Sequence, residues 1–256
     1  MPLSGRGTGH VGPTTRSGSG PLTGGRPAFY APTGSLLGDL VSLLHVPYTL
    51  WHLSYVPIGA ALAPSLDFRL LAGTLAAFLF GLGIGAHALD EVKSRPLGTR
   101  LTDRALWTMG IGAMAVSLAI GVVGGFVISP WVPVWAAAGI LLAVGYALEW
   151  PVLHTDLGFG LAWGAFPLLV GHWAQTGTVS VPVLVVAAAA TLLSLAQRAL
   201  STPARFVRRR TSETVTRFDQ DREWSRAELL DTWEKPLRLL TWTTLALAVG
   251  LLLTHL

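Results

Sequence analysis

The chain has 256 residues, of which 51% are hydrophobic and 12% charged, and its formal net charge is +4. Soluble domains usually carry about 25% charged residues, so this composition excludes an ordinary soluble domain and indicates an integral membrane protein. Cysteine is absent, which excludes disulfides, thiol nucleophiles and thiolate metal sites. The basic balance does not indicate a nucleic-acid partner, because the arginines lie beside apolar spans, where membrane topology explains them.

Residues 1–33 are rich in Gly, Ser, Thr and Pro and show almost no apolar periodicity. A segment of this composition cannot bury enough apolar surface to fold alone, so we expect a disordered N-terminal tail. It also lacks the apolar core of a signal peptide, so no cleavage is expected. Residues 34–256 are then a single transmembrane domain.

The transmembrane domain is predicted to be an all-α, multi-pass helical bundle. A membrane-spanning helix needs roughly 20 predominantly apolar residues. Seven segments meet this requirement: 38–63, 68–89, 102–128, 131–149, 155–175, 180–200 and 237–255.

The distribution of basic residues predicts the orientation in the cell membrane. With seven spans, one face holds the N-terminal tail, 90–101, 150–154 and 201–236. When the residues at the helix ends are counted with the adjacent loops, that face carries 17 of the 18 Lys and Arg residues. The exception is Arg69. Positive charge favours the cytoplasmic side, so we expect a cytoplasmic N-terminus and an extracytoplasmic C-terminus.

The cytoplasmic loop 201–236 contains one further helix signal. Ser225 and Glu228 have the spacing of a capping box, and Leu229, Leu230 and Trp233 follow on one side. This pattern predicts a short helix that lies at the membrane interface and leads into the last span.

The second span ends in a group of ionisable residues. On a helix, His87 lies three residues before Asp90 and four before Glu91, so the three side chains share a face on which one cation could bridge them. Ionisable groups at a membrane helix end indicate a functional site by default. The alternative is an ordinary membrane border, at which the first charges of the helix enter water.

Other polar residues are predicted at the same depth on other helices. His45, Tyr48 and His52 share a face of the first span, and Pro47 and Pro57 interrupt that span. With the second-span group, the candidate substrate-binding residues are His45, Tyr48, His52, Arg95, Tyr146, Glu149, His154, Arg198 and Arg205. Groups from several helices at one depth are typical of a pocket.

Two stretches resemble the UbiA superfamily of intramembrane prenyltransferases. That family carries an Asn-Asp-x-x-Asp motif at the end of its second helix, followed by an Arg-Pro-Leu-x-x-Gly-like stretch. Here Ala86 and His87 replace Asn and Asp, Asp90 is retained, and Arg95-Pro96-Leu97-Gly98 follows sooner than usual. The segment 146–177 is similar to the family's tyrosine-containing stretch that leads into a glycine-rich helix ending in Thr-Gly. The resemblance covers roughly 37–198.

The chain departs from the family in two ways. The second Asp-rich motif should follow the sixth helix, but QRALSTPAR contains no carboxylate there. Family members usually have nine helices, and seven are predicted here. Because function depends on the site, these departures weigh more on activity than on fold.

The resemblance implies a divergent UbiA-like prenyltransferase that acts on an isoprenoid diphosphate or a related lipid in a cytoplasm-facing cavity. His87, Asp90 and Glu91 would be catalytic and would hold one divalent cation, Mg²⁺ in the family. The same donors also suit iron, manganese or zinc. The arginines would contact phosphate oxygens.

Three alternatives remain open. The first is an isoprenoid cyclase, in which some of the ten Trp residues would face a cation. The second is a different metal-dependent membrane enzyme. The third is a non-catalytic lipid-binding or assembly protein that keeps the fold. Membrane lipids are partners in every case.

Overall fold

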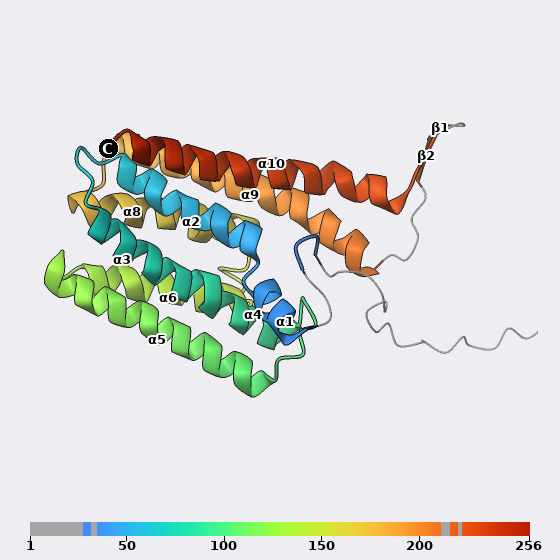
Figure 1. Cartoon of the computed structure of the whole chain (residues 1–256), viewed down its shortest axis with the longest axis horizontal. Helices are drawn as coiled ribbons and strands as arrows, with labels where there is room; N and C mark the ends of the chain where they lie inside the picture. Colours follow the sequence, from blue (N-terminus) through green and yellow to red (C-terminus); the bar gives the residue numbers. More distant parts are fainter. Residues whose placement is uncertain (1–27, 32–34, 211–215, 220–221) are drawn as a thin grey trace, which may run out of the picture.

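The structure is a computed structural model that describes residues 28–31, 35–210, 216–219 and 222–256. These residues form a bundle of roughly aligned helices (Figure 1). Each of the seven predicted spans corresponds to a helical segment. The helices are α1 (Leu36–Leu43), α2 (Val46–Ala61), α3 (Phe68–Phe78), η1 (Leu79–Ala86), α4 (His87–Ser94), α5 (Asp103–Val127), α6 (Val132–Ala147), α7 (Asp156–Gly160), η2 (Leu161–Ala165), α8 (Phe166–Thr176), α9 (Val181–Arg210) and α10 (Arg226–Leu253).

Among the described residues, five helical segments are long and apolar enough to cross a membrane: 68–94, 103–127, 156–176, 181–210 and 226–253. The other two predicted spans are shorter helices, α2 and α6, with 16 residues each. At 1.5 Å per residue each covers about 24 Å, less than the roughly 30 Å of a bilayer core. The all-α membrane bundle that the composition predicts is therefore confirmed.

The first predicted span is broken in two. His45 lies between α1 and α2 with a φ of 46°, a left-handed conformation, and Pro47 follows in the first turn of α2. The sequence predicts an interruption by proline, and the break falls just before it. Pro57, by contrast, lies inside α2 without ending the helix.

The second and fifth spans each contain π-helical turns. η1 joins α3 to α4, and η2 joins α7 to α8. Such turns are rare and are often found at functional sites. In this protein η1 directly precedes His87, so the wider turn sets the position of the predicted site residues.

The core lies around α2, which packs between α8 and α10. Trp51 and Tyr55 of α2 are fully buried, as is Leu168 of α8. The backbones of α2 and α8 approach closely because two glycines face the opposite helix. A Cβ atom on Gly59 would lie 1.9 Å from the Leu168 carbonyl oxygen, and one on Gly171 would lie 2.2 Å from that of Val56.

The predicted loop 201–236 differs from expectation, because much of it is helical. α9 continues through Pro203 to Arg210, where three arginines complement the negative end of the helix dipole. The capping box at Ser225 and Glu228 is confirmed, but it opens one continuous 28-residue helix instead of a short interfacial one. α9 and α10 consequently project beyond the other helices in Figure 1.

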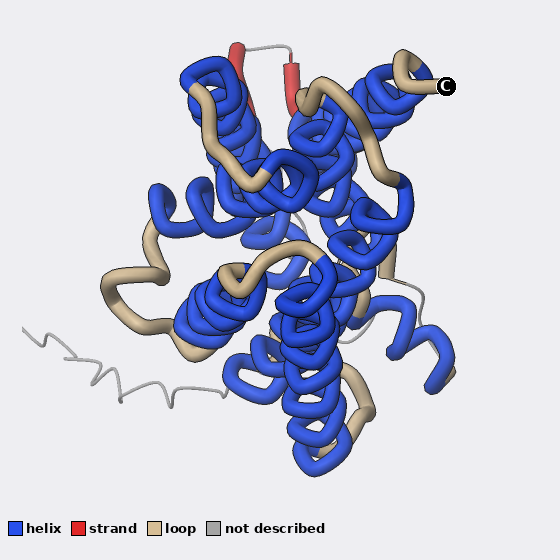
Figure 2. Tube along the Cα trace, turned by 90° about the vertical axis from the view of Figure 1, so that its left-hand side faces the viewer, coloured by secondary structure: helices blue, strands red, loops and turns tan. Residues whose placement is uncertain are grey.

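Two short strands lie between these helices. β1 (Thr216–Asp219) and β2 (Arg222–Trp224) pair antiparallel, with Thr216 opposite Trp224. They are drawn in red in Figure 2, which views the bundle after a quarter turn. They belong to the loop, so the bundle itself remains all-α.

The predicted N-terminal tail lies outside the described residues except for 28–31. Those four residues differ from the expectation for 1–33, because they pack on the bundle. Ala28 and Ala31 are buried, and Phe29 and Tyr30 contact Tyr48 of α2 edge-on. The physical reason is the burial of aromatic surface. Phe29 and Tyr30 are the first Phe, Tyr or Trp residues of the chain, so this is the first place at which the tail has large apolar side chains to pack on the bundle.

Candidate functional site

The end of the bundle that carries α1 and α4 contains a group of polar residues from six segments. We call it the polar cluster and define it as Tyr30, His45, His87, Asp90, Tyr146, His154, Arg198 and Arg205. The contacts below show how each member is held, and they separate it from predicted residues that serve the fold.

Two histidines stack at the start of the polar cluster. The rings of His45 and His87 lie 4.4 Å apart between centroids with an interplanar angle of 14°. His45 Nδ1 lies 2.8 Å from the Tyr30 hydroxyl oxygen, and His87 Nδ1 lies 3.0 Å from the Gly83 carbonyl oxygen in η1. The break before α2 and the wide turns of η1 thus bring the two rings together.

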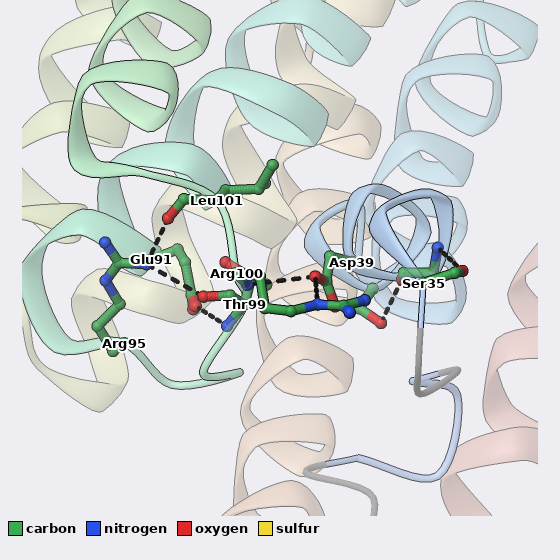
Figure 3. Close-up of polar contacts among 9 residues, drawn as sticks. Ser35, Asp39, Glu91, Arg95, Thr99, Arg100 and Leu101 are labelled. Carbon is green, nitrogen blue, oxygen red and sulfur yellow. Dashed lines mark hydrogen bonds and ion pairs between the residues drawn. The ribbon is translucent and has the colours of Figure 1, made fainter.

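Asp90 and Glu91 have different environments although they are adjacent. Glu91 is fully buried, and its two carboxylate oxygens accept the backbone N–H groups of Leu97 and Thr99 at 2.9 and 2.8 Å. Figure 3 shows this carboxylate turned into the loop after α4. Asp90 is half-buried, and its carboxylate has no hydrogen bond or ion pair to any described residue.

The predicted metal site does not fit these residues. Among the described residues, no group of three or more His, Asp or Glu side chains is placed to hold a metal ion. Glu91 already uses both oxygens on backbone amides, and His87 is stacked on His45. Asp90 is the one member of the predicted set, within the described part of the chain, whose side chain is uncommitted.

Arg95 also serves the loop after α4. Its guanidinium donates to the carbonyl oxygen of Leu101 at 2.8 Å and forms an ion pair with Asp103. Arg100 of the same loop binds Asp39 of α1 at 2.9 Å, so the loop is tied to two helices (Figure 3). The predicted phosphate contact of Arg95 is therefore replaced by structural bonds.

A second part of the polar cluster is centred on Tyr146. His154 stacks on its ring with 4.6 Å between centroids, and Trp163 contacts it at 4.5 Å. Arg198 donates to the Tyr146 hydroxyl and pairs with Asp156 at 2.5 Å. The Arg198 guanidinium also lies over the ring of Phe159 at 5.4 Å, so a cation here faces aromatic rings.

The other predicted site residues are either buried in the core of the bundle or exposed outside the polar cluster. His52 is buried, with Nδ1 2.9 Å from the Trp163 carbonyl oxygen. Tyr48 is buried against Phe29 and Tyr30. Glu149 has a left-handed backbone conformation with a φ of 60° and is exposed, so the structure does not bring it into the polar cluster.

The cations of α9 connect the two parts of the polar cluster. Arg205 lies within electrostatic range of Tyr30, Asp90 and Tyr146, and the described residues provide it with no ion pair. Arg209 also lies within electrostatic range of Tyr30 and Asp90. Arg209 is not among the residues predicted from the sequence, because an arginine triplet usually marks topology. Its neighbour Arg208 instead pairs with buried Glu234 of α10.

Sequence reasoning also missed three aromatic residues: Tyr30, which belongs to the polar cluster, and Phe159 and Trp163, which pack beside it. Tyr30 lies within the segment expected to be a tail, although its aromatic ring was a signal that could have shown burial. Phe159 and Trp163 stack on each other at 5.6 Å and lie four residues apart, on one face of the fifth segment. That spacing is visible in the sequence.

A comparison with solved structures finds a similar fold. The chain matches a UbiA homolog from Archaeoglobus fulgidus, described as bound to Cd²⁺, with a TM-score of 0.54 and 16% sequence identity over 83% of this chain and 76% of that one. No protein-family model matches the sequence, and no curated protein is significantly similar to it. At this identity the likeness concerns the fold alone, so the chain is an integral membrane protein with a UbiA-like helical bundle.

Proposed function

We propose that this protein is a divergent UbiA-like prenyltransferase that binds an isoprenoid diphosphate at the polar cluster, on the cytoplasmic side of the membrane. The observation that carries the proposal is the half-buried carboxylate of Asp90, which has no hydrogen bond or ion pair to the described residues and lies within electrostatic range of Arg205, in a bundle of UbiA-like fold. A charged group without a partner at a membrane helix end has a high cost, which function explains better than folding.

The cations of α9 suit the diphosphate of such a ligand. Arg205 has no ion pair in the described residues, and Arg198 is held beside Tyr146. Guanidinium groups bind phosphate oxygens with charge-assisted hydrogen bonds. Positive charge at this position would stabilise the diphosphate as it leaves with the electron pair of the broken carbon–oxygen bond.

The aromatic rings beside Arg198 suit the other half of the reaction. Tyr146, Phe159 and Trp163 contact one another, and their faces can stabilise positive charge that develops on the prenyl carbon. An acceptor nucleophile would then bond to that carbon and lose a proton. Asp90, whose carboxylate has no hydrogen bond or ion pair to the described residues, would accept that proton.

A non-catalytic lipid-binding protein is the second candidate. The observation that favours it is the structural use of Glu91, which removes one of the three carboxylate or imidazole groups expected to form the metal site. Diphosphate release distinguishes the two candidates, because a binder retains the ligand unchanged.

The test measures both binding and release of diphosphate with farnesyl diphosphate, an isoprenoid diphosphate, with and without Mg²⁺. Asp90→Asn should slow turnover, and with it diphosphate release, because it removes the base that accepts the proton of the acceptor. Arg205→Ala should weaken binding by about tenfold, which corresponds to roughly 1.4 kcal/mol. Arg104→Ala is the matched control, because Arg104 is an exposed arginine at the same end of the bundle. Binding without release would favour the second candidate, and absence of binding would contradict both.

A further inference from the structure

A cavity lies between α3, α5, α6 and α8, and no residue of the polar cluster lines it. Its volume is about 270 Å³, and its lining is almost entirely apolar. It begins at Arg69, in the first turn of α3, and ends at Leu82 and Trp163 near the middle of the bundle. We call it the lateral groove. It lies in the half of the molecule that faces away from the polar cluster.

Small residues create the lateral groove. Gly73 of α3 lines it, and a Cβ atom on Gly73 would meet no atom within 4 Å. Larger aromatic rings form the walls. The ring centroid of Trp135 lies 5.9 Å from that of Phe166 and 5.8 Å from that of Trp173. A space of this kind in a membrane protein suits a hydrocarbon chain, since apolar walls offer no polar partner.

The inner end of the lateral groove is closed toward the polar cluster. Leu82, Ala143 and Trp163 line the groove and are buried in one apolar core with Ala86, Leu89 and Ala147. Tyr146 and Phe159 pack on the side of Trp163 that is nearer the polar cluster. A chain in the groove therefore enters from the Arg69 end, not from the polar cluster.

The open end of the lateral groove carries an unpaired cation. Arg69 is exposed, and its guanidinium has no hydrogen bond or ion pair to any described residue. The nearby carboxylate of Asp67 instead accepts the backbone N–H groups of Arg69 and Leu70 at the start of α3. The charge of Arg69 is thus available to a ligand at the mouth of the groove.

From this geometry we infer that the lateral groove binds one anionic phospholipid, with an acyl chain along Gly73 and its phosphate on Arg69. The inference does not depend on the proposed function, because no residue of the polar cluster lines the groove and Trp163, which borders both sites, is left unchanged in the test. It assigns a membrane lipid as a specific ligand at the end of the bundle opposite the polar cluster.

The test uses phosphatidylglycerol with brominated acyl chains, which quench tryptophan fluorescence on contact. Full-length protein, stripped of lipid in detergent, should be quenched because Trp135, Trp163 and Trp173 line the groove. Gly73→Leu fills the groove and should remove most of this quenching. Arg69→Gln should raise the required lipid concentration about fivefold, as expected for loss of one basic residue worth about 1 kcal/mol.

The matched control is Gly112→Leu. Gly112 is a helical glycine of α5 at which an added Cβ atom would also meet no atom within 4 Å, and it does not line the groove. This variant should behave as the wild type. Equal quenching of Gly73→Leu and the wild type would overturn the inference, as would equal affinity for brominated phosphatidylcholine. Displacement of the lipid by farnesyl diphosphate would also overturn it, because the groove would then hold the tail of the other ligand.

Discussion

The carboxylate of Glu91 accepts the backbone N–H of Thr99 at 2.8 Å and so ties the end of α4 to the loop that follows. A second bond from the Leu97 N–H, at 2.9 Å, completes the contact. Glu91→Ala leaves both buried N–H groups without an acceptor, and each loss costs about 1–3 kcal/mol. We expect a clearly lower thermal unfolding temperature for this variant in detergent.

Two variants sharpen this prediction. Glu91→Gln keeps the shape of the side chain and one acceptor oxygen, so its unfolding temperature should lie between those of the wild type and Glu91→Ala. Asp90→Asn should not lower stability, and is expected to raise it, because the Asp90 carboxylate makes no hydrogen bond or ion pair to the described residues and the change removes an unpartnered charge. If Asp90→Asn destabilises the protein as much as Glu91→Ala, the assignment of roles to these two carboxylates is wrong.

This pair also shows where sequence reasoning reached its limit. Helical spacing places His87, Asp90 and Glu91 on adjacent positions of one face, and α4 confirms the helix. The contacts of Glu91, however, are to backbone amides six and eight residues later. Backbone N–H groups are common to nearly all residues, so no residue type in the loop indicates that it folds back onto α4. The same holds for Arg95, whose partner oxygens are mainly backbone carbonyls.

The N-terminal segment provides a second prediction. Tyr30 contacts His45 through its hydroxyl and Tyr48 through its ring. A chain that begins at residue 28 should therefore unfold at the same temperature as the full chain, whereas one that begins at residue 35 should be less stable. Tyr30→Phe keeps the ring and removes the hydroxyl, so it should cost about 1 kcal/mol. Thermal unfolding of the full chain, the two truncations and Tyr30→Phe makes the comparison, and equal stability of both truncations would contradict it.

A buried ion pair fastens α9 to α10. Glu234 of α10 has only 4% of its side chain exposed and accepts two hydrogen bonds from Arg208 of α9, one of them at 2.6 Å. Arg238 contributes a longer contact of 3.6 Å. Removing one partner of a buried pair leaves an unpaired charge and costs about 3–5 kcal/mol. Glu234→Gln should therefore lower the unfolding temperature strongly.

The double variant tests whether the effect belongs to the pair. Arg208→Met with Glu234→Leu removes both charges, so it should be less destabilising than Glu234→Gln alone. Arg104→Ala removes an exposed arginine and should be nearly neutral. A double variant that is less stable than Glu234→Gln would show that the charges are not coupled.

The arginines of α9 show a further limit of the sequence. The triplet 208–210 could be read only as a block of positive charge. In the helix three successive side chains point in different directions, so Arg208 pairs with Glu234, while Arg209 lies within electrostatic range of Asp90. The direction of each depends on how α9 packs against α10 and α4, which is a long-range property.

The last prediction concerns membrane topology. It rests on the distribution of basic residues in the sequence and on the position of the C-terminus in the fold. The number of predicted spans, seven, is odd, so the two termini of the bundle should lie on opposite sides of the membrane. His255 Nε2 lies 2.9 Å from the Ala61 carbonyl oxygen, which places the C-terminus beside the loop that contains Ser65. In Figure 1 this end is opposite the strands.

Reporter fusions at Ser65 and Leu256 should therefore report the extracytoplasmic side, and a fusion at Arg210 the cytoplasmic side. A reporter at Leu256 that matches Arg210 would require an even number of crossings and would refute the seven-span topology.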